Sequence, residues 1–178
     1  MKKLKNSELN RKSISEFKKS KKIPTIIILE NIRSAHNVGA VFRNSDAFII
    51  EKIILCGITP CPPNRQISKT ALGATDSIKW EYQEKSQQII KKLKKEGYSI
   101  ISIEQVENST RLENFKIEKH KKIALIFGNE INGVDQKSIN MSDEIVEIPQ
   151  YGTKHSLNIS VCSGIILWEI FKNNKNNY

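Results

Sequence analysis

Polar side chains interrupt the last apolar stretch of the sequence, HSLNISVCSG (155–164). Ser156, Asn158 and Ser160 alternate there with aliphatic residues, just before the apolar run Ile165–Trp168. A buried amide or hydroxyl that lacks a hydrogen-bond partner costs about 1–3 kcal/mol. Ser156 is explained as the N-cap of a helix, but Asn158 and Ser160 need partners, either backbone groups of the protein or a polar ligand.

A second polar cluster, IFGNEINGVD (126–135), overlaps the end of an apolar run. Gly128 and Gly133 allow the backbone to approach a ligand closely. Between them, the Glu130 carboxylate can accept a hydrogen bond from a ligand hydroxyl or ammonium group, or hold an arginine side chain. The competing interpretation is an ordinary turn in which Asp135 caps the next short helix.

A third cluster, ENIRSAHNVGAVFRNSDAF (30–48), also follows an apolar run. Asn31 and Asn37 flank a turn, Gly39 permits close backbone approach, and Arg43 falls within the helix that follows. The alternative is structural, with Asn37 as an N-cap and Arg43 as a solvated helix residue. Neither GxGxxG nor GxxxxGK[ST] occurs, so the sequence supports neither a dinucleotide-binding Rossmann fingerprint nor a P-loop.

The apolar pattern around these clusters alternates between strands and helices. Continuous aliphatic runs predict buried strands, and a short alternating run predicts one more, at 25–30, 51–57, 98–104, 122–128, 144–149 and 77–82. Helical periodicity predicts helices at 37–48, 85–97 and 156–171, and 58–66 is a Pro-rich loop. This order predicts an α/β fold, a mostly parallel sheet with helices on both faces. Ligands of such sheets bind beyond the carboxyl ends of the strands, where all three polar clusters lie.

The first 22 residues carry nine lysines and arginines against two glutamates, a net of +7 that leaves only +3 for the other 156 residues. Such a segment either binds phosphate backbones or is a solvated, solubilising tail. Ser7 and Ser13 are candidate N-caps of one or two short helices there, and Pro24 ends the segment. We therefore expect a basic helical arm at 1–23, one domain at 24–172 and a polar tail at 173–178.

Length and composition fit one globular domain, with 178 residues of which 38% are hydrophobic. No apolar run reaches the ~20 residues that span a bilayer, and the N-terminus lacks the apolar core of a signal peptide. Three cysteines without CxxC spacing favour neither a disulfide framework nor a zinc site. We expect a cytoplasmic protein that engages no membrane and no metal.

Taken together, the three clusters resemble the three motifs of the SpoU (TrmH-like) branch of the SPOUT RNA methyltransferases. The matching stretches are Asn31 with Asn37-x-Gly39-x-x-x-Arg43, FGNEINGV (127–134) and IPQYGTKHSLNISV (148–161). All three occur in order and at strand ends, which makes the match specific. The resemblance extends from about residue 25 to 171 and includes CGITPCPPNRQISKTALGA (56–74).

The resemblance implies a C-terminal trefoil knot, S-adenosylmethionine bound within the knot, and a homodimer that methylates a ribose 2′-hydroxyl of tRNA or rRNA. It implies catalytic roles for Arg43, Asn37, Glu130, Ser156 and Asn158. It also implies cofactor contacts, largely through backbone groups, for Ile103, Glu104, Gly128, Asn129, Ile148, Ser156 and Leu157. Ser156 and Asn158 would then be polar because they face cofactor and substrate.

The chemistry constrains the role of Arg43. A ribose hydroxyl is a weak nucleophile, so the site must orient it in line with the methyl group and favour loss of its proton. An arginine, whose pKa exceeds about 12, is a poor general base. We therefore expect Arg43 to stabilise the developing alkoxide or to act through a bound substrate phosphate.

We expect no large appended RNA-binding domain, which favours a short tRNA feature over an elaborate rRNA site as the substrate. His36 departs from the residue that many relatives carry beside Asn37, and we interpret it as an exposed turn residue. Two alternatives to an enzyme of this kind remain. One is a non-catalytic RNA-binding protein that keeps the knotted fold, and the other is a nucleotide-binding α/β protein, which would lack a glycine loop for its phosphates.

Overall fold

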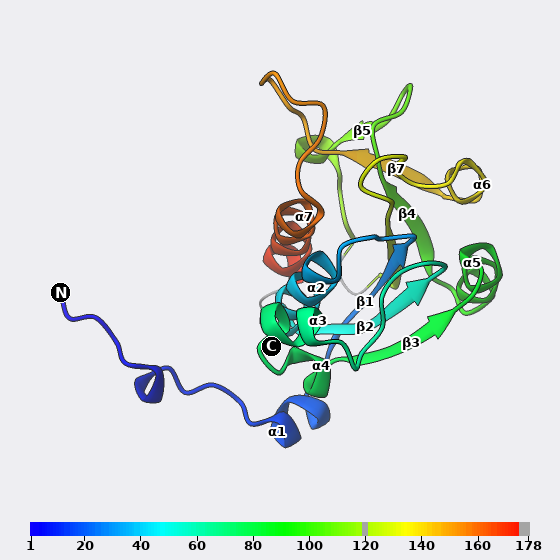
Figure 1. The fold of residues 1–178 in the computed structure, drawn as a ribbon. Coiled ribbons are helices and arrows are strands. Elements are labelled where there is room, and N and C mark those ends of the chain that lie inside the picture. The colour runs from blue at the N-terminus through cyan, green and yellow to red at the C-terminus, as the bar shows by residue number, and fades with distance from the viewer. Residues whose placement is uncertain (119–120, 175–178) are drawn as a thin grey trace.

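Seven strands form one sheet in the computed structural model, counted over residues 1–118 and 121–174, which are the residues that the structure describes (Figure 1). Their spatial order is β3 (Lys79–Gln83), β2 (Ile50–Cys56), β1 (Ile23–Glu30), β6 (Ile123–Phe127), β4 (Ser99–Ile103), β7 (Glu144–Glu147) and β5 (Thr110–Arg111). Each of these neighbouring pairs is parallel. The predicted α/β class with a parallel sheet is confirmed.

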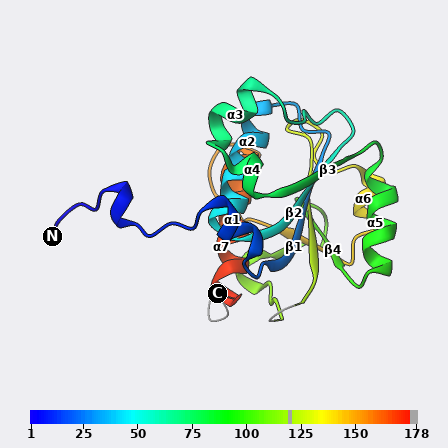
Figure 2. The ribbon, with the colours of Figure 1, turned by 90° about the horizontal axis from the view of Figure 1, so that it is seen from below.

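Helices cover both faces of the sheet, as predicted (Figure 2). One face carries α2 (Ala35–Ala47), α3 (Arg65–Ala71), α4 (Ala74–Ser77) and α7 (Ile159–Asn174), and the other carries α5 (Ser86–Lys95) and α6 (Gln136–Ile139). The run in β1 explains why both faces are covered. Ile27 and Leu29 point into the first core and Ile26 and Ile28 into the second, so the strand is buried on both sides.

Two helices begin at residues other than those predicted, because another side chain caps each of them. Ser34 caps α2 by accepting a hydrogen bond from the backbone N–H of Asn37, so Asn37 lies inside the helix and is not its N-cap. The last helix begins at Ile159 and not at Ser156, since the Asn158 Oδ1 accepts from Ser160 N at 2.8 Å. The polar stretch that interrupts the apolar pattern is therefore a loop and a cap.

Several elements between the buried strands were not predicted from the sequence. The stretch 58–66 was expected to be a loop, but its last two residues begin a helix, because Asn64 caps α3 by accepting from the N–H groups of Gln66 and Ile67. The two-residue strand β5 was missed, as were α4 and the 3-10 turn Leu112–Asn114. Pro24 lies inside β1 and does not end the preceding segment.

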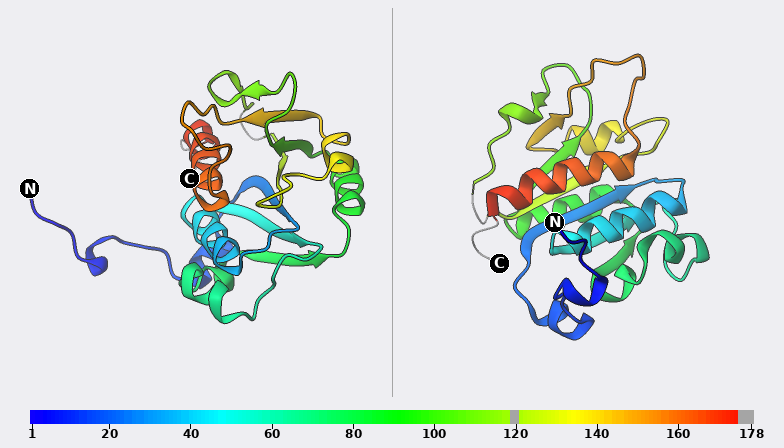
Figure 3. Two further views of the ribbon diagram at one scale, coloured as in Figure 1. Left: turned by 45° about the horizontal axis from the view of Figure 1, so that its top comes forward. Right: turned by 90° about the vertical axis from the view of Figure 1, so that its left-hand side faces the viewer.

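The basic arm forms one helix that packs on the domain. In α1 (Ile14–Lys19), Ser13 and Glu16 form a capping box, as expected for Ser13, and Phe17 is buried in the main core. Ser7 lies inside the 3-10 turn Asn6–Glu8 and not at the position before it, where an N-cap residue would stand. Figure 3 shows the chain before α1 extending away from the domain. Helix α7 continues to Asn174, and the rest of the predicted polar tail, 175–178, lies outside the described residues.

No helix within 1–118 and 121–174 is both long and apolar enough to cross a membrane. The topology instead concentrates polar loops at one edge. Strands β1, β6, β4 and β7 are neighbours, so their carboxyl ends lie side by side. The residues that follow these ends are Asn31, Gly128, Glu104 and Ile148, respectively. The sheet therefore brings segments of all three sequence clusters to one place.

Helix α2 can pack closely on α3 only because residue 39 is glycine. A Cβ atom built there would lie 2.1 Å from the Thr70 Oγ1 and 2.3 Å from the Ile67 backbone oxygen. The Thr70 hydroxyl already donates to the His36 carbonyl at 2.9 Å, so the two helices are tied at this point. A clash with backbone cannot be relieved by a change of rotamer.

We expect Gly39→Ala to lower the free energy of unfolding by about 1–3 kcal/mol or more, because overpacking forces the helices apart. Gly152→Ala is the matched control, since a Cβ atom at residue 152 meets nothing within 4 Å. Denaturant titration of the two variants measures the difference. Equal denaturation midpoints for the two variants would contradict the close packing of α2 on α3.

Candidate active site

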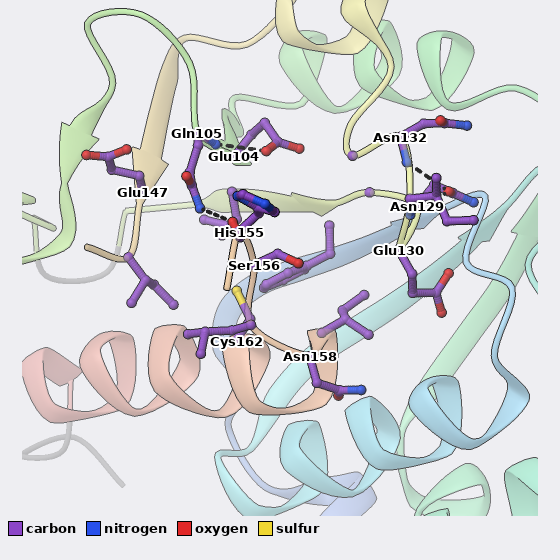
Figure 4. Close-up of a pocket in the computed structure, with 18 of the residues that line it drawn as sticks. Glu104, Gln105, Asn129, Glu130, Asn132, Glu147, His155, Ser156, Asn158 and Cys162 are labelled. Carbon is purple, nitrogen blue, oxygen red and sulfur yellow. Dashed lines mark hydrogen bonds between the residues drawn. The ribbon is translucent and has the colours of Figure 1, made fainter. Parts of the chain in front are cut away.

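A cavity of about 460 Å³ lies beyond the carboxyl ends of β4, β6 and β7 (Figure 4). The loop 148–158 closes its other side. Every residue for which the resemblance implied a cofactor contact lines this cavity: Ile103, Glu104, Gly128, Asn129, Ile148, Ser156 and Leu157. The structure thus brings together residues that are up to 54 positions apart in the chain. Their role in binding stays a prediction.

The loop after β6 is a tight turn closed on itself. Asn129 N donates to Gly133 O, and Gly133 N donates to Asn129 O, both at 2.9 Å. Gly133 has φ +68, and a Cβ atom on Gly128 would lie 2.1 Å from the Val134 nitrogen. Both glycines are therefore required by the backbone, as their positions beside Glu130 indicated. The Asn129 Nδ2 also donates to the Asn31 carbonyl at 2.7 Å, which docks this loop on the turn after β1.

Three of the five predicted catalytic residues form a chain of hydrogen bonds. Asn158 Nδ2 donates to Asn37 Oδ1 at 3.2 Å, and Asn37 Nδ2 donates to Glu130 Oε1 at 3.0 Å. Glu130 also accepts from the backbone N–H groups of Arg33 at 2.9 Å and Ser34 at 3.1 Å. The chain of hydrogen bonds thus contains one residue from each of the three sequence clusters.

The Glu130 carboxylate is held in its charged form. Burial raises the pKa of Glu130, but the hydrogen bonds from the Arg33 backbone, the Asn37 amide, its own backbone and the Ser34 backbone outweigh burial, so the net pKa is below the usual 4.5. A carboxylate with a lowered pKa and several donors is a weak base. Its evident role is to hold the turn that begins α2.

The other two predicted catalytic residues are placed differently. Ser156 is exposed on the wall of the cavity, and no hydrogen bond of its side chain is found within the described ranges. Arg43 lies on the exposed side of α2 and lines neither this cavity nor the hollow beside it. The chain by itself therefore does not bring Arg43 to Glu130 and Asn158. His36 is exposed, as expected, but it lies within helix α2 and not in the turn before it, because Ser34 caps the helix.

The cavity is acidic although the chain carries a net charge of +10. Glu104, Glu130 and Glu147 line it, and no lysine or arginine of the described residues does. Glu104 accepts from Gln105 N at 2.8 Å and from Val134 N at 2.9 Å, which fixes its carboxylate against the glycine loop. A pocket with this charge favours a cationic ligand.

Sequence reasoning missed several lining residues, among them Gln105, Glu147, His155 and Cys162. Cys162 follows Asn158 by four positions, and this helical spacing was the available signal. Burial and then the charge of Glu104 raise the pKa of Cys162 to about 12, so its thiol stays protonated and is a neutral part of the wall. No group of three or more His, Cys, Asp or Glu side chains within the described ranges is arranged to hold a metal ion.

A second, shallower hollow of about 380 Å³ adjoins the cavity at Glu130. It is lined by Arg33, Ser34, Asn37 and Glu130. The larger cavity and this hollow meet at the hydrogen-bonded chain of Glu130, Asn37 and Asn158.

Because the pKa of Glu130 is lowered on folding, its ionised form stabilises the protein above the unfolded pKa, and this contribution is lost as the pH falls through the folded value. We expect Glu130→Gln to lower the melting temperature at pH 7, and the deficit to shrink as the pH is lowered below 4.5. Melting curves of wild type and variant across this range measure it. Glu107→Gln, at an exposed position away from the cavity, is the control and should show no such trend.

Comparison with known proteins connects this geometry to a family. The sequence model of the SpoU rRNA Methylase family matches residues 24–168. The chain is 31% identical over 169 residues to the 23S rRNA (guanosine-2'-O-)-methyltransferase RlmB of Blochmanniella floridana, covering 94% of this chain and 65% of that protein. It thus spans less than two thirds of the length of this curated relative.

Two solved structures share the fold. The A. aeolicus TrmH/SpoU tRNA modifying enzyme superposes with a TM-score of 0.81 at 23% identity, covering 92% of this chain and 81% of that one. The AdoMet-bound rRNA methyltransferase from Sinorhizobium meliloti superposes with a TM-score of 0.77 at 24% identity, covering 83% and 56%. The trefoil knot that the resemblance implies stays a prediction for this chain. The family match over residues 24–168, together with the three motifs meeting at one edge of a parallel sheet, shows that the chain belongs to the SpoU rRNA methylase family.

Proposed function

We propose that the protein transfers a methyl group from S-adenosylmethionine to a ribose 2′-hydroxyl of RNA. The observation that carries this proposal is the junction of an acidic cavity with a second hollow at Glu130, Asn37 and Asn158. The relatives support it, since one is a 23S rRNA (guanosine-2'-O-)-methyltransferase and a structure with this fold is an AdoMet-bound rRNA methyltransferase. These names divide between rRNA and tRNA, and tRNA is the substrate that sequence reasoning favours.

The cavity fits the proposed cofactor in size and charge. Its volume lies in the range of small-molecule sites, about 300–1,000 Å³. S-adenosylmethionine carries a sulfonium and an ammonium group, for which Glu104 and Glu147 supply opposite charge. Ile103, Ile148 and Leu157 supply apolar surface for an adenine ring. When bound, the cofactor supplies an electrophilic methyl group that needs little activation.

The chain's own residues would then orient the nucleophile. The Asn37 and Asn158 amides are held by their mutual hydrogen bond and by Glu130, Asn37 in the second hollow and Asn158 on the wall of the larger cavity, so they can position a ribose between the two without rearranging. Ser156, on the wall of the larger cavity, is free to bond a sugar hydroxyl. Fixed donors of this kind contribute to catalysis because they are already in place when charge develops on the reacting oxygen.

A homodimer would bring Arg43 to such a site. Helix α7 exposes Val161, Ile165 and Trp168 at i, i+4 and i+7, an apolar stripe beside α2. Because Arg43 lines neither the larger cavity nor the second hollow, the catalytic role implied for it requires a second copy to meet the exposed side of α2. We propose that the α7 stripe is the surface on which that copy docks.

The cofactor prediction is tested by thermal shift. We expect S-adenosylmethionine to stabilise the protein by about 2.7 kcal/mol at one hundred times its Kd, because it binds only the folded state. A non-catalytic RNA-binding protein with this fold would show no shift. Mapping of 2′-O-methylation in tRNA and rRNA, with and without the protein and then with the purified components, identifies the RNA. Cofactor binding without any new ribose methylation would contradict the proposed reaction.

The dimer prediction is tested at Ile165. We expect Ile165→Glu to shift the protein from dimer to monomer in sedimentation velocity and to abolish methyl transfer, because a charge is placed in the apolar stripe and Arg43 loses its site. Ile58→Glu is the control, since Ile58 is also exposed but lies in the turn after β2, outside the α7 stripe. An Ile165→Glu protein that stays dimeric, or a monomeric wild type with full activity, would contradict this assembly.

A further inference from the structure

Arg33 is an arginine that the chain itself brings to the second hollow. Arg33 lines the hollow together with Ser34, Asn37 and Glu130. Its backbone N–H donates to the Glu130 Oε2 at 2.9 Å, so the position of its Cα atom is fixed by the same carboxylate that organises the site. None of the roles implied by the three motifs was assigned to it.

The Arg33 guanidinium is not committed to another group. Arg33 is exposed, and within the described residues its side chain has no hydrogen bond or ion pair. Arg111 makes a useful contrast, since it pairs with Glu113 at 2.8 Å and bonds the Tyr151 hydroxyl. Glu130 lines the same hollow as Arg33, but its oxygens already accept from Arg33 N, Ser34 N and Asn37 Nδ2. The carboxylate is thus engaged by the turn and leaves the guanidinium available.

The chemistry of a ribose in this hollow calls for a cation. The 2′-hydroxyl of a nucleotide within an RNA chain is vicinal to a 3′-phosphate, so a phosphate must lie within a few ångströms of the reacting oxygen. The ionised Glu130 would repel that phosphate unless a positive charge lay beside it. A guanidinium matches a phosphate with two parallel hydrogen bonds.

We propose that Arg33 is a phosphate-binding residue that positions the substrate nucleotide, acting in the same chain as the Glu130, Asn37 and Asn158 network. This inference rests on the proposed function, because the phosphate belongs to the RNA whose ribose is methylated. It assigns Arg33 a task distinct from that of Arg43, which lies outside the hollow. The two arginines would then contact the substrate from different chains of the dimer.

The test compares Arg33→Gln with Lys91→Gln, which removes the same charge from the exposed side of α5 on the other face of the sheet. RNA binding is measured with unfractionated tRNA and with a 23S rRNA transcript. Each titration contains S-adenosylhomocysteine and is repeated at salt concentrations between about 50 and 200 mM. We expect Arg33→Gln to weaken binding about tenfold and to reduce the slope of log K against log salt by about one, because one phosphate contact is lost. Lys91→Gln should match wild type.

Steady-state kinetics separate positioning from general damage to the fold. For Arg33→Gln we expect a raised KM for RNA and an unchanged KM for S-adenosylmethionine, with Arg33→Lys restoring part of the RNA affinity. An active wild type whose Arg33→Gln variant keeps the wild-type salt slope and RNA KM would overturn the role of Arg33 and leave the proposed function standing. A wild type that neither binds nor methylates either RNA would overturn the proposed function, and the inference with it.

Discussion

The site depends on one carboxylate that ties two distant segments together. Glu130 belongs to the loop after β6, yet its oxygens accept from backbone and side chain at the start of α2, more than 90 residues earlier. The sheet makes this possible because β1 and β6 are neighbours and end at the same edge. Asn129 reinforces the junction through its bond to the Asn31 carbonyl. These contacts place the Asn37 amide, and through it the Asn158 amide, against the loop after β6.

The distribution of charge gives the two hollows different preferences. The larger cavity is lined by three glutamates, whereas the smaller one places the guanidinium-bearing Arg33 beside Glu130. A cationic donor and a polyanionic acceptor can bind side by side only where the electrostatic potential differs between their two sites. A potential of one sign throughout would repel one of the two ligands. The boundary between the two fields falls at Glu130. The basic arm at 1–22 adds positive charge outside both hollows.

Much of the fold was predictable because its strands are continuous apolar runs, as in TIIILE (25–30), which β1 confirms. The meeting of Asn37, Glu130 and Asn158 was also predictable, because each belongs to a polar segment that follows a strand end. The predictions that failed concern where individual helices begin. Asn64 caps α3 within a stretch whose prolines indicated a loop, and Asn158 takes the capping role expected of Ser156, since several polar residues in each segment compete for one position. That Arg43 lies outside the cavity of its own chain could not be predicted. Sequence spacing places a residue in a helix but does not say which neighbour its exposed side chain will contact.

The Asn158 side chain both caps α7 and joins the network of the site, which affects when the site can form. Its side chain oxygen starts α7 and its amide nitrogen completes the hydrogen bonds to Asn37, so the formation of that helix and the completion of the site are one event. All seven strands precede it in the chain. The hydrogen bonds of Asn158 can therefore form only after every strand of the described sheet has been synthesised, so this network is completed late in translation.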